Sequence, residues 1–260
     1  MISVIIPTYN KGPFIEAALE SVAGQTLSDF EILIVDDGST DGTERLVSAA
    51  GFSNLRYLRT AHAGIAAARN RGLSESRRPY VAFLDSDDLW RPDHLEKALA
   101  ALEGPSALVA AGDYDEIDAL GRGLGVSRAA EGRGVHPGFA RATGLPFLPL
   151  LQGAVFRREL VKRAGGFDEG FRSAFEDIDF FARIHGRFGP DAFRIRAQSS
   201  CAYRRHRGQA TWGMEGFLLD VPSRMAKWKL LAPRERDCLL DLARLKAKHA
   251  QWLKPILAAA

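Results

Sequence analysis

Short apolar runs alternate with stretches of helical periodicity along the first third of the chain. Buried strands are predicted for residues 2–6, 31–35, 55–58 and 80–84. Between them, helical spacing of apolar residues fills 14–22 and 64–75, and Asp41 is placed to cap a further helix that carries Leu46 and Val47. Alternating strands and helices build parallel sheets through right-handed crossovers. We therefore predict an α/β fold with a Rossmann-like, mostly parallel central sheet flanked by helices.

Acidic turns follow two of these predicted strands. One spans residues 36–42 and the other residues 85–88. In open parallel sheets, ligands bind beyond the carboxyl ends of the strands, which is where both turns fall. We therefore place the candidate site at this edge of the sheet.

Each acidic turn has a structural explanation as well as a functional one. Asp37-Gly38 is a common turn dipeptide, and taken alone a turn explains it better than a nucleobase contact does. Asp85, Asp87 and Asp88 repel one another unless a cation joins them, and hard oxygen ligands select Mg²⁺ or Mn²⁺. A solvated turn with helix-capping aspartates explains these three residues equally well.

The second half of the chain has a less regular pattern. Residues 113–142 are rich in Gly, Arg and Asp, and we expect an irregular hairpin or a mobile loop there. The irregular region 113–149 would cover the acceptor. An apolar run at 148–156, helical spacing at 176–188 and a strand at 193–203 follow. The tail from Pro222 has the apolar spacing of one or two amphipathic helices.

Three further groups of side chains are candidates for chemistry. The forked donors of Arg69 suit a diphosphate. Glu176 and Asp177 begin a predicted helix, where the helix dipole stabilises an anion. His206 lies in a basic run, residues 203–207. A surface arginine, ordinary charge at a helix start and a solvated strand are the structural explanations of the same residues.

Composition narrows the class of protein. The 260 residues suit one large α/β domain with a small appendage, and a formal charge of +3 does not indicate a nucleic-acid partner. The two cysteines, Cys201 and Cys238, lie in no metal-ligand spacing and are typical of a reducing compartment. The opening residues lack the basic region of a signal peptide, and no apolar run approaches a membrane span. We expect a cytoplasmic protein with at most peripheral association at the inner membrane surface.

The order of the motifs is more informative than any one of them. Together they resemble the family 2 glycosyltransferases, which have the GT-A fold, and the resemblance is dense over residues 2–95. The segments that carry it are Val4-Ile5-Ile6-Pro7-Thr8-Tyr9-Asn10, Gln25-Thr26, Val35-Asp36-Asp37-Gly38-Ser39-Thr40-Asp41, Ala68-Arg69-Asn70-Arg71-Gly72, Phe83-Leu84-Asp85-Ser86-Asp87-Asp88 and, more thinly, Gly165-Gly166-Phe167-Asp168-Glu169 and Phe175-Glu176-Asp177.

This resemblance implies a nucleotide pocket at the ends of the first two strands. Pro7, Thr8 and Tyr9 would line the pocket. Asp37 would contact the base, expected to be uracil, and Arg69 would lie near the base or the phosphates.

The resemblance also implies a divalent metal, Mn²⁺ or Mg²⁺. Asp85 and Asp87 match the DxD motif of the family, in which the first aspartate faces ribose or sugar and the second binds the metal. His206 falls where some members place a phosphate or metal contact.

An inverting reaction with a single in-line displacement is a further implication. Asp177 matches the general base of the family, and Glu176 beside it would contact the acceptor. Gly153 lies where the backbone approaches the sugar and the acceptor. The transition state would have the oxocarbenium character known from glycoside hydrolysis.

We therefore predict a metal-dependent inverting glycosyltransferase that moves a sugar from a nucleotide diphosphate, expected to be a UDP-sugar, to a saccharide or lipid-linked saccharide hydroxyl. Polysaccharide or lipopolysaccharide biosynthesis is the expected setting. The Gln-x-x-Arg-Trp motif of processive synthases is missing, which indicates single additions. Residues 1–215 would form the GT-A domain, with a nucleotide-binding half at 1–110 and an acceptor-binding half at 111–215. A helical extension would follow at 216–260.

Two other functions fit part of the sequence. A catalytically inactive nucleotide-sugar binding module would keep the donor site, although the joint presence of Asp37, Asp85, Asp87 and Asp177 argues against it. A haloacid dehalogenase-type phosphatase also has Asp-x-Asp after an apolar strand. Its motif continues to a Thr or Val two residues past the second aspartate, where this chain has Leu89.

Overall fold

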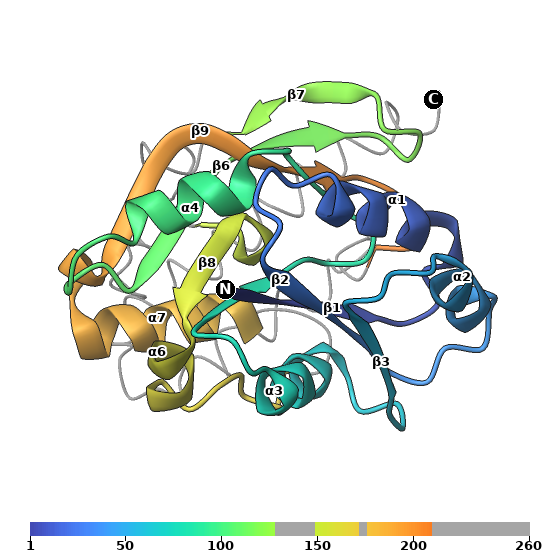
Figure 1. Ribbon diagram of the computed structural model, residues 1–260, viewed down its shortest axis with the longest axis horizontal. Helices are drawn as coiled ribbons and strands as arrows, with labels where there is room; N and C mark the ends of the chain where they lie inside the picture. The colour runs from blue at the N-terminus through green and yellow to red at the C-terminus, as the bar shows by residue number, and fades with distance from the viewer. Residues whose placement is uncertain (128–148, 172–175, 210–260) are drawn as a thin grey trace, which may run out of the picture.

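Four parallel strands from the N-terminal region form one half of the central sheet (Figure 1). The computed structural model describes residues 1–127, 149–171 and 176–209, and the order of these strands across the sheet is β3-β2-β1-β4. Their bounds are β1 Ile2–Thr8, β2 Phe30–Asp36, β3 Leu55–Arg59 and β4 Tyr80–Phe83. The register pairs Thr8 with Asp36, so β1 and β2 end side by side. All four predicted strands are thereby confirmed.

Strands from the second half of the chain extend the same sheet. The order continues β4-β8-β6-β9-β5, and β7 pairs with β6 as a hairpin. Their bounds are β5 Leu89–Trp90, β6 Val109–Ile117, β7 Gly123–Ser127, β8 Ala154–Arg157 and β9 Phe193–Arg204. β8 is antiparallel to both of its neighbours, whereas β9 is parallel to β6, so β6 and β9 run in the same direction as β1 to β4. The prediction of a mostly parallel sheet is confirmed, and the first part of the segment 113–142 takes the predicted hairpin form.

Helices cover both faces of the sheet (Figure 1). On one face lie α1 Gly12–Ala23, α2 Thr43–Ala49 and α4 His94–Ala101, and on the other α3 Ile65–Glu75, α6 Arg158–Arg163 and α7 Glu176–Phe188. Two 3-10 turns, η1 Leu151–Gly153 and η2 Pro190–Ala192, precede β8 and β9. The predictions of α1, α2, α3 and α7 are confirmed, whereas α4 and α6 were not predicted.

Burial on both faces explains why β1 and β2 are apolar runs rather than alternating patterns. In β1, Ile5 packs in the core cluster that includes α3 and α7, whereas Val4 and Ile6 pack in the cluster that includes α1 and α4. Each fully buried side chain of this size contributes roughly 1.5–3 kcal/mol relative to exposure. Because these two cores stabilise the sheet, the polar side chains at the carboxyl ends of the strands are not needed for core packing and can bind a ligand.

A close approach of α3 to β1 depends on Gly72. A Cβ at this position would lie 2.4 Å from Cγ2 of Ile5, which is closer than carbon atoms can pack. The missing side chain lets α3 lie directly against the sheet. Arg69, one turn earlier in the same helix, is consequently 2% exposed.

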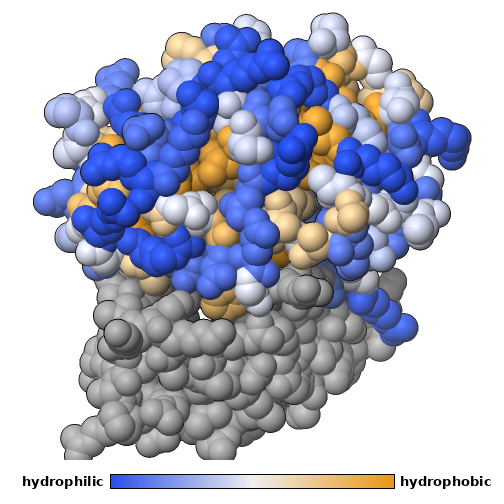
Figure 2. Space-filling model, turned by 90° about the horizontal axis from the view of Figure 1, so that it is seen from below, coloured by the Kyte–Doolittle hydropathy of each residue, from blue (hydrophilic) through white to orange (hydrophobic). Residues whose placement is uncertain are grey.

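Parts of the predicted organisation lie outside the described residues, namely most of the acceptor-covering segment and the extension at 216–260. Strands from both predicted halves, 1–110 and 111–215, share one sheet. Within the described ranges, no helix is long and apolar enough to cross a membrane. Where Figure 2 shows described residues, hydrophilic side chains predominate and hydrophobic ones form separated patches.

Candidate active site

The candidate site forms where β1, β2 and β4 end. The side-chain oxygen of Asn10, directly after β1, accepts the backbone N–H of Thr40 at 2.8 Å and of Asp41 at 3.3 Å. Asp41 in turn accepts the N–H of Gly12 at 2.9 Å and of Thr43 at 3.0 Å, so one carboxylate joins the starts of α1 and α2. Asn10 has a φ of 52°, a left-handed conformation that Asn tolerates better than most residues. These bonds hold the segments after β1 and β2 as one unit.

The carboxylate of Asp37 anchors the loop that precedes α3. Asp37 is 4% exposed. Its Oδ1 accepts the Ala63 N–H at 2.9 Å and its Oδ2 the Gly64 N–H at 2.8 Å, and the Thr60 hydroxyl lies 3.3 Å from Oδ1. The nucleobase contact implied for Asp37 stays a prediction, and it would use carboxylate lone pairs that these bonds leave free.

An aromatic pair stands at the same edge. The rings of Tyr9 and His62 stack with centroids 4.1 Å apart and planes inclined by 25°. Tyr9 is 42% exposed, so the pair lies at the surface of the site rather than in its core. Nδ1 of His62 lies 3.0 Å from Oδ2 of Asp37. His62 was not among the predicted site residues, because a lone histidine in a loop carries no signal of its own.

The end of β1 also presents an open hydrogen-bonding position. Thr8 is 3% exposed, its carbonyl accepts the Asp37 N–H at 2.9 Å, and its Oγ1 has no partner among the described residues. Buried hydroxyls nearly always have a partner, so a ligand group could complete this one. Pro7, paired with Val35 inside the sheet, is buried. Of the three residues predicted to line the nucleotide pocket, Tyr9 is the exposed one.

Gln152 joins two of the three aspartates that follow β4. Its Nε2 donates to Oδ2 of Asp85 and to Oδ2 of Asp88, both at 2.8 Å. Asp88 is 1% exposed and also accepts the Arg204 N–H at 2.7 Å. Burial raises the pKa of Asp88 well above its usual range, and the charges of Asp87 and Asp85 raise it further. Asp88 therefore joins the acidic turn to the end of β9. Both of its carboxylate oxygens accept hydrogen bonds within the protein, so we do not assign it as a metal ligand.

Asp87 is held by two nitrogen-bearing side chains. Nζ of Lys11 lies 2.6 Å from its Oδ2, and Nε2 of His206 lies 2.9 Å from the same oxygen. Burial raises the pKa of Asp87, but the His206 hydrogen bond and the Lys11 charge outweigh burial and lower it to about 2. Lys11 also donates to the Gly208 carbonyl at 3.1 Å, and the Phe14 ring lies 4.4 Å from that of His206. The turn after β9 is thus docked on the start of α1.

The donor set at Asp87 fits a divalent cation that is shared with a ligand. Within the described ranges, no group of three or more His, Cys, Asp or Glu side chains could hold a metal. Asp87 and His206 supply a carboxylate and an imidazole, and Mg²⁺ sites commonly add substrate phosphates and water. The Gly208 N–H donates to Nδ1 of His206 at 3.2 Å, so the ring proton is on Nε2. Ligation through Nε2 would require that proton to leave, whereas Asp87 needs only to exchange Lys11 for the cation.

Arg69 joins Asp85 to the first turn of α7. Its Nη2 donates to Oδ1 of Asp85 at 2.6 Å, and its Nη1 donates to Oε1 of Glu176. Its guanidinium lies over the Phe167 ring, 5.5 Å from the centroid. Burial would lower the pKa of Arg69, but the charges of Asp85 and Glu176 raise it. Arg69 was predicted to lie near the base or the phosphates. The structure gives it two carboxylate partners in a buried bridge, and the nucleotide contact stays a prediction.

Glu176 and Asp177 occupy the first turn of α7 and differ in burial. Glu176 is 4% exposed, and burial raises its pKa to about 7. The positive charge of Arg69 lowers this pKa, and the negative charge of Asp177 raises it further. Oε2 of Glu176 has no hydrogen-bond partner in the described part of the chain. Asp177 is half-buried, and its Oδ1 accepts the Ile178 N–H at 2.8 Å. Asp177 is therefore the more accessible of the two carboxylates.

Asn70 joins two segments that are far apart in the sequence. Its Nδ2 donates to the Phe167 carbonyl and its Oδ1 accepts the Phe167 N–H, both at 2.9 Å. Gly166 has a φ of 67°, and a Cβ there would lie 2.6 Å from the Asn70 side-chain oxygen. Because Asn70 follows Arg69 directly, this contact also holds the Phe167 ring against the Arg69 guanidinium.

Gly153 packs against protein atoms. A Cβ at this position would lie 2.9 Å from the Ser200 hydroxyl and 3.3 Å from the Gly112 carbonyl. Close packing of η1 on β6 and β9 thus accounts for the glycine. The approach to sugar and acceptor implied by the resemblance stays a prediction, for which this packing is a structural alternative.

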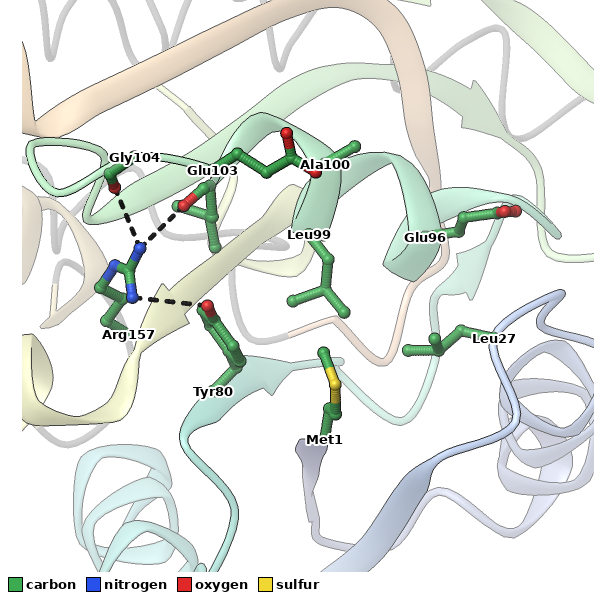
Figure 3. Close-up of a pocket in the computed structure, with 10 residues that line it drawn as sticks. Met1, Leu27, Tyr80, Glu96, Leu99, Ala100, Glu103, Gly104 and Arg157 are labelled. Carbon is green, nitrogen blue, oxygen red and sulfur yellow. Dashed lines mark hydrogen bonds between the residues drawn. The ribbon is translucent and has the colours of Figure 1, made fainter.

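A hollow of about 510 Å³ opens at the other edge of the sheet (Figure 3). Met1 and Tyr80, at the starts of β1 and β4, line it together with Leu99 of α4. Arg157 closes one side by donating to the carbonyls of Leu102 at 2.8 Å and Gly104 at 3.1 Å. This hollow lies at the opposite ends of the parallel strands from the acidic turns and is not part of the candidate site.

The chain is similar in sequence to known glycosyltransferases. The family model described as "Glycosyl transferase family 2" matches residues 3–177. An "Uncharacterized glycosyltransferase" of Rickettsia felis is 38% identical over 146 residues, which is 56% of this chain and 23% of that protein. The Escherichia coli "UDP-Glc:alpha-D-GlcNAc-diphosphoundecaprenol beta-1,3-glucosyltransferase WfgD" is 34% identical over 119 residues, 45% of this chain and 47% of that protein.

A solved structure shows the same fold at low sequence identity. S. aureus TarS 1-349 in complex with UDP-GlcNAc superposes with a TM-score of 0.68 at 22% identity, covering 92% of this chain and 70% of that one. The chain spans between 20% and 26% of the length of the rickettsial relatives that it matches.

Proposed function

Because the chain belongs to glycosyl transferase family 2 and has the GT-A fold, we propose that it transfers a sugar from a nucleotide diphosphate to an acceptor hydroxyl with inversion at the anomeric carbon. The observation that carries this proposal is the Arg69 bridge. It brings Asp85, at the end of β4, into one unit with the first turn of α7, which carries Asp177. A donor-side carboxylate and a candidate base are thereby joined by a single buried side chain.

The donor would lie along the carboxyl edge of the sheet. Its base would stack at Tyr9 near Asp37, its ribose or sugar would face Asp85, and its diphosphate would lie near Asp87. A UDP-sugar is the proposed donor. Support comes from WfgD, whose name specifies UDP-Glc, and from TarS, which was crystallised with UDP-GlcNAc.

Asp177 would act as the general base. It is half-buried and keeps Oδ2 without a partner in the described ranges, so it can accept the proton of an attacking hydroxyl. Glu176 is committed to Arg69 and would orient the acceptor through its remaining oxygen. The base needs no partner acid, because the leaving diphosphate requires neutralised charge rather than a proton.

Asp87, with His206 beside it, would hold the Mn²⁺ or Mg²⁺ ion, which as a Lewis acid stabilises the departing diphosphate. Lys11 balances the charge of Asp87. If a cation took the place of the Lys11 ammonium at Asp87, the ammonium would become available to bind the phosphates as a point charge.

Cell-surface polysaccharide or lipopolysaccharide assembly is the setting that we propose. The acceptor would be a saccharide or a lipid-linked saccharide, as the name of WfgD specifies for that relative. Family membership argues against the phosphatase alternative, and so does the position of Asp85 and Asp87 after the fourth strand in the middle of the sheet.

Calorimetric titration of UDP with Mn²⁺ present, repeated in EDTA, is the first test. We expect binding that requires the metal and that Asp87→Asn abolishes. Asp93→Asn, which changes a partly exposed carboxylate paired with Lys97, should bind as the wild type does. Screening of UDP-sugars for hydrolysis and transfer would follow, with the anomeric configuration of the product read by NMR.

Three outcomes would change the proposal. Binding of dTDP or GDP in place of UDP would correct the donor class. Binding of a donor with neither transfer nor hydrolysis would favour the inactive module. A product that retains the anomeric configuration would overturn the inverting mechanism.

A further inference from the structure

The side chain of His62 contacts both Tyr9 and Asp37, the two residues proposed to bind the nucleobase. It lies in the loop between β3 and α3, and its ring stacks on Tyr9 at a centroid distance of 4.1 Å. Its Nδ1 lies 3.0 Å from Oδ2 of Asp37 and 3.1 Å from the Asp37 carbonyl oxygen. The side chain of His62 is 59% exposed, so core packing does not account for this position.

The protonation of the imidazole follows from these contacts. A carboxylate oxygen and a carbonyl oxygen both accept hydrogen bonds, so Nδ1 must carry a proton to bind either of them. The side chain thus presents a flat aromatic face to Tyr9 and an N–H donor to Asp37. A pyrimidine base of the uracil type presents the same two features, a flat ring and an imide N–H.

We propose that the His62 imidazole occupies the nucleobase position in the donor-free protein and that the base of the donor displaces it. This inference rests on the proposed function, since it concerns the donor site of that same reaction. It makes His62 a residue that sets the apparent affinity for the nucleotide, because part of the binding free energy is spent on moving its side chain.

Displacement follows from the space at the stack. At a centroid separation of 4.1 Å the two rings are in direct contact, so no base can enter between them. The loop need not move for His62 to leave, because the backbone N–H groups of Ala63 and Gly64 hold Asp37 in place. Rotation of one exposed side chain clears both the face of Tyr9 and the edge of Asp37.

Calorimetric titration of UDP with Mn²⁺ into wild type, His62→Ala and His62→Asn tests this inference. We expect His62→Ala to bind UDP about three- to tenfold more tightly, since no ring has to be displaced. His62→Asn, which keeps a donor for Asp37 but has no ring, should show a smaller gain. Inorganic pyrophosphate with Mn²⁺ has no base and should bind all three proteins equally.

The outcomes separate the inference from the proposed function. If wild type binds UDP and His62→Ala binds it equally or more weakly, the inference fails and the function stands; weaker binding would make His62 a wall of the base site. If neither protein binds UDP, dTDP or GDP, both fail. Circular dichroism melts of the variants, expected to match the wild type because His62 is exposed, check that the fold is intact.

A second measurement follows the ring itself. Stacking on Tyr9 should shift the His62 Cε1–H NMR resonance upfield by ring current, and Tyr9→Ala should return it toward the value of a free histidine. Saturating UDP should move the wild-type resonance in the same direction as Tyr9→Ala does. A resonance that UDP leaves in place would overturn the proposal.

Discussion

The turn after β2 and the turn after β4 are both acidic, but different kinds of group hold their carboxylates. In the turn after β2, Asp36 accepts the Ser39 N–H at 2.6 Å. Asp37 accepts the N–H groups of Ala63 and Gly64 at 2.9 and 2.8 Å. Side chains also bind both carboxylates, the Tyr57 hydroxyl at Asp36 and the His62 imidazole at Asp37. The backbone donors, however, cannot leave without a change in the path of the chain, so both carboxylates keep structural partners even where a side chain such as His62 is displaced.

In the turn after β4, the partners of Asp85 and Asp87 are side chains. They are Arg69 and Gln152 for Asp85, and Lys11 and His206 for Asp87. Side chains such as Lys11 can rotate away and be exchanged for a ligand at little cost to the fold. Asp88, with the Arg204 backbone N–H as a partner, is the exception in this turn and belongs with the structural carboxylates. Two runs of similar composition thus differ in what can displace their partners.

The largest effect is expected at Asp177, which has no side-chain partner in the described residues. Asp177→Asn should lower the transfer rate by roughly two to four orders of magnitude, because the general base is lost. UDP affinity should stay within about twofold, since the base does not touch the nucleotide. Steady-state kinetics and calorimetry measure the two effects. Asp93→Asn, which changes a carboxylate that precedes α4 and pairs with Lys97, is the control. Near-full turnover of Asp177→Asn would remove the base assignment.

Stability should separate the two turns. Asp37→Asn places an amide NH₂ against one of two buried backbone N–H donors and should lower the free energy of unfolding by about 1–3 kcal/mol. Asp87→Asn should lower it by on the order of 2 kcal/mol at pH 7, since the pKa of the carboxyl falls from 3.8 to about 2 in the folded protein, and this loss should shrink as the pH drops from 4 toward 2. Urea denaturation of both variants without ligand, at several pH values, is the measurement. A loss in Asp87→Asn that does not vary with pH would contradict the distinction between the turns.

Removal of Lys11 should expose Asp87 to the metal. Without nucleotide, Lys11→Met should bind Mn²⁺ about tenfold more tightly, because the cation no longer competes with an ammonium 2.6 Å from the carboxylate. Electron paramagnetic resonance of free Mn²⁺ during titration gives the affinity. Lys97→Met, which removes the partner of Asp93 on the surface, should leave it unchanged. Weaker Mn²⁺ binding to Lys11→Met would show that Lys11 assists the site.

The last effect concerns pH and Glu176. Burial raises the pKa of Glu176 from 4.5 to about 7, so the folded state holds this proton more tightly than the unfolded chain does. The wild type should therefore lose stability relative to Glu176→Gln as pH rises from 4.5 to 7, and the difference should be flat above that. The change should total roughly 3 kcal/mol, because each pKa unit corresponds to about 1.4 kcal/mol. Urea denaturation at several pH values measures it, with the exposed Glu159→Gln as control. A difference that does not vary with pH would show that Glu176 ionises normally.

Local patterns predicted most of the elements because each signal lies within its own segment. Apolar runs that end in polar turns identified β1 to β4, and helical spacing identified α1, α3 and α7. The missed helices, α4 and α6, have eight and six residues and depend on tertiary packing for their stability. Gln152 and Lys11 were missed for a similar reason, since neither lies in a run of chemically similar residues.

The sequence by itself determined the fold class and the edge of the sheet where the carboxylates gather, because local periodicity gives the succession of strands and helices along the chain and the positions of the turns. It also singled out Asp37, Asp85, Asp87 and Asp177 as candidates. Tertiary structure alone decided which group holds each carboxylate. Lys11 is 76 positions from Asp87, and Arg69 is 107 positions from Glu176. Such pairs form only when the register of the sheet and the packing of α3 bring distant segments together, and a local sequence pattern cannot predict that geometry.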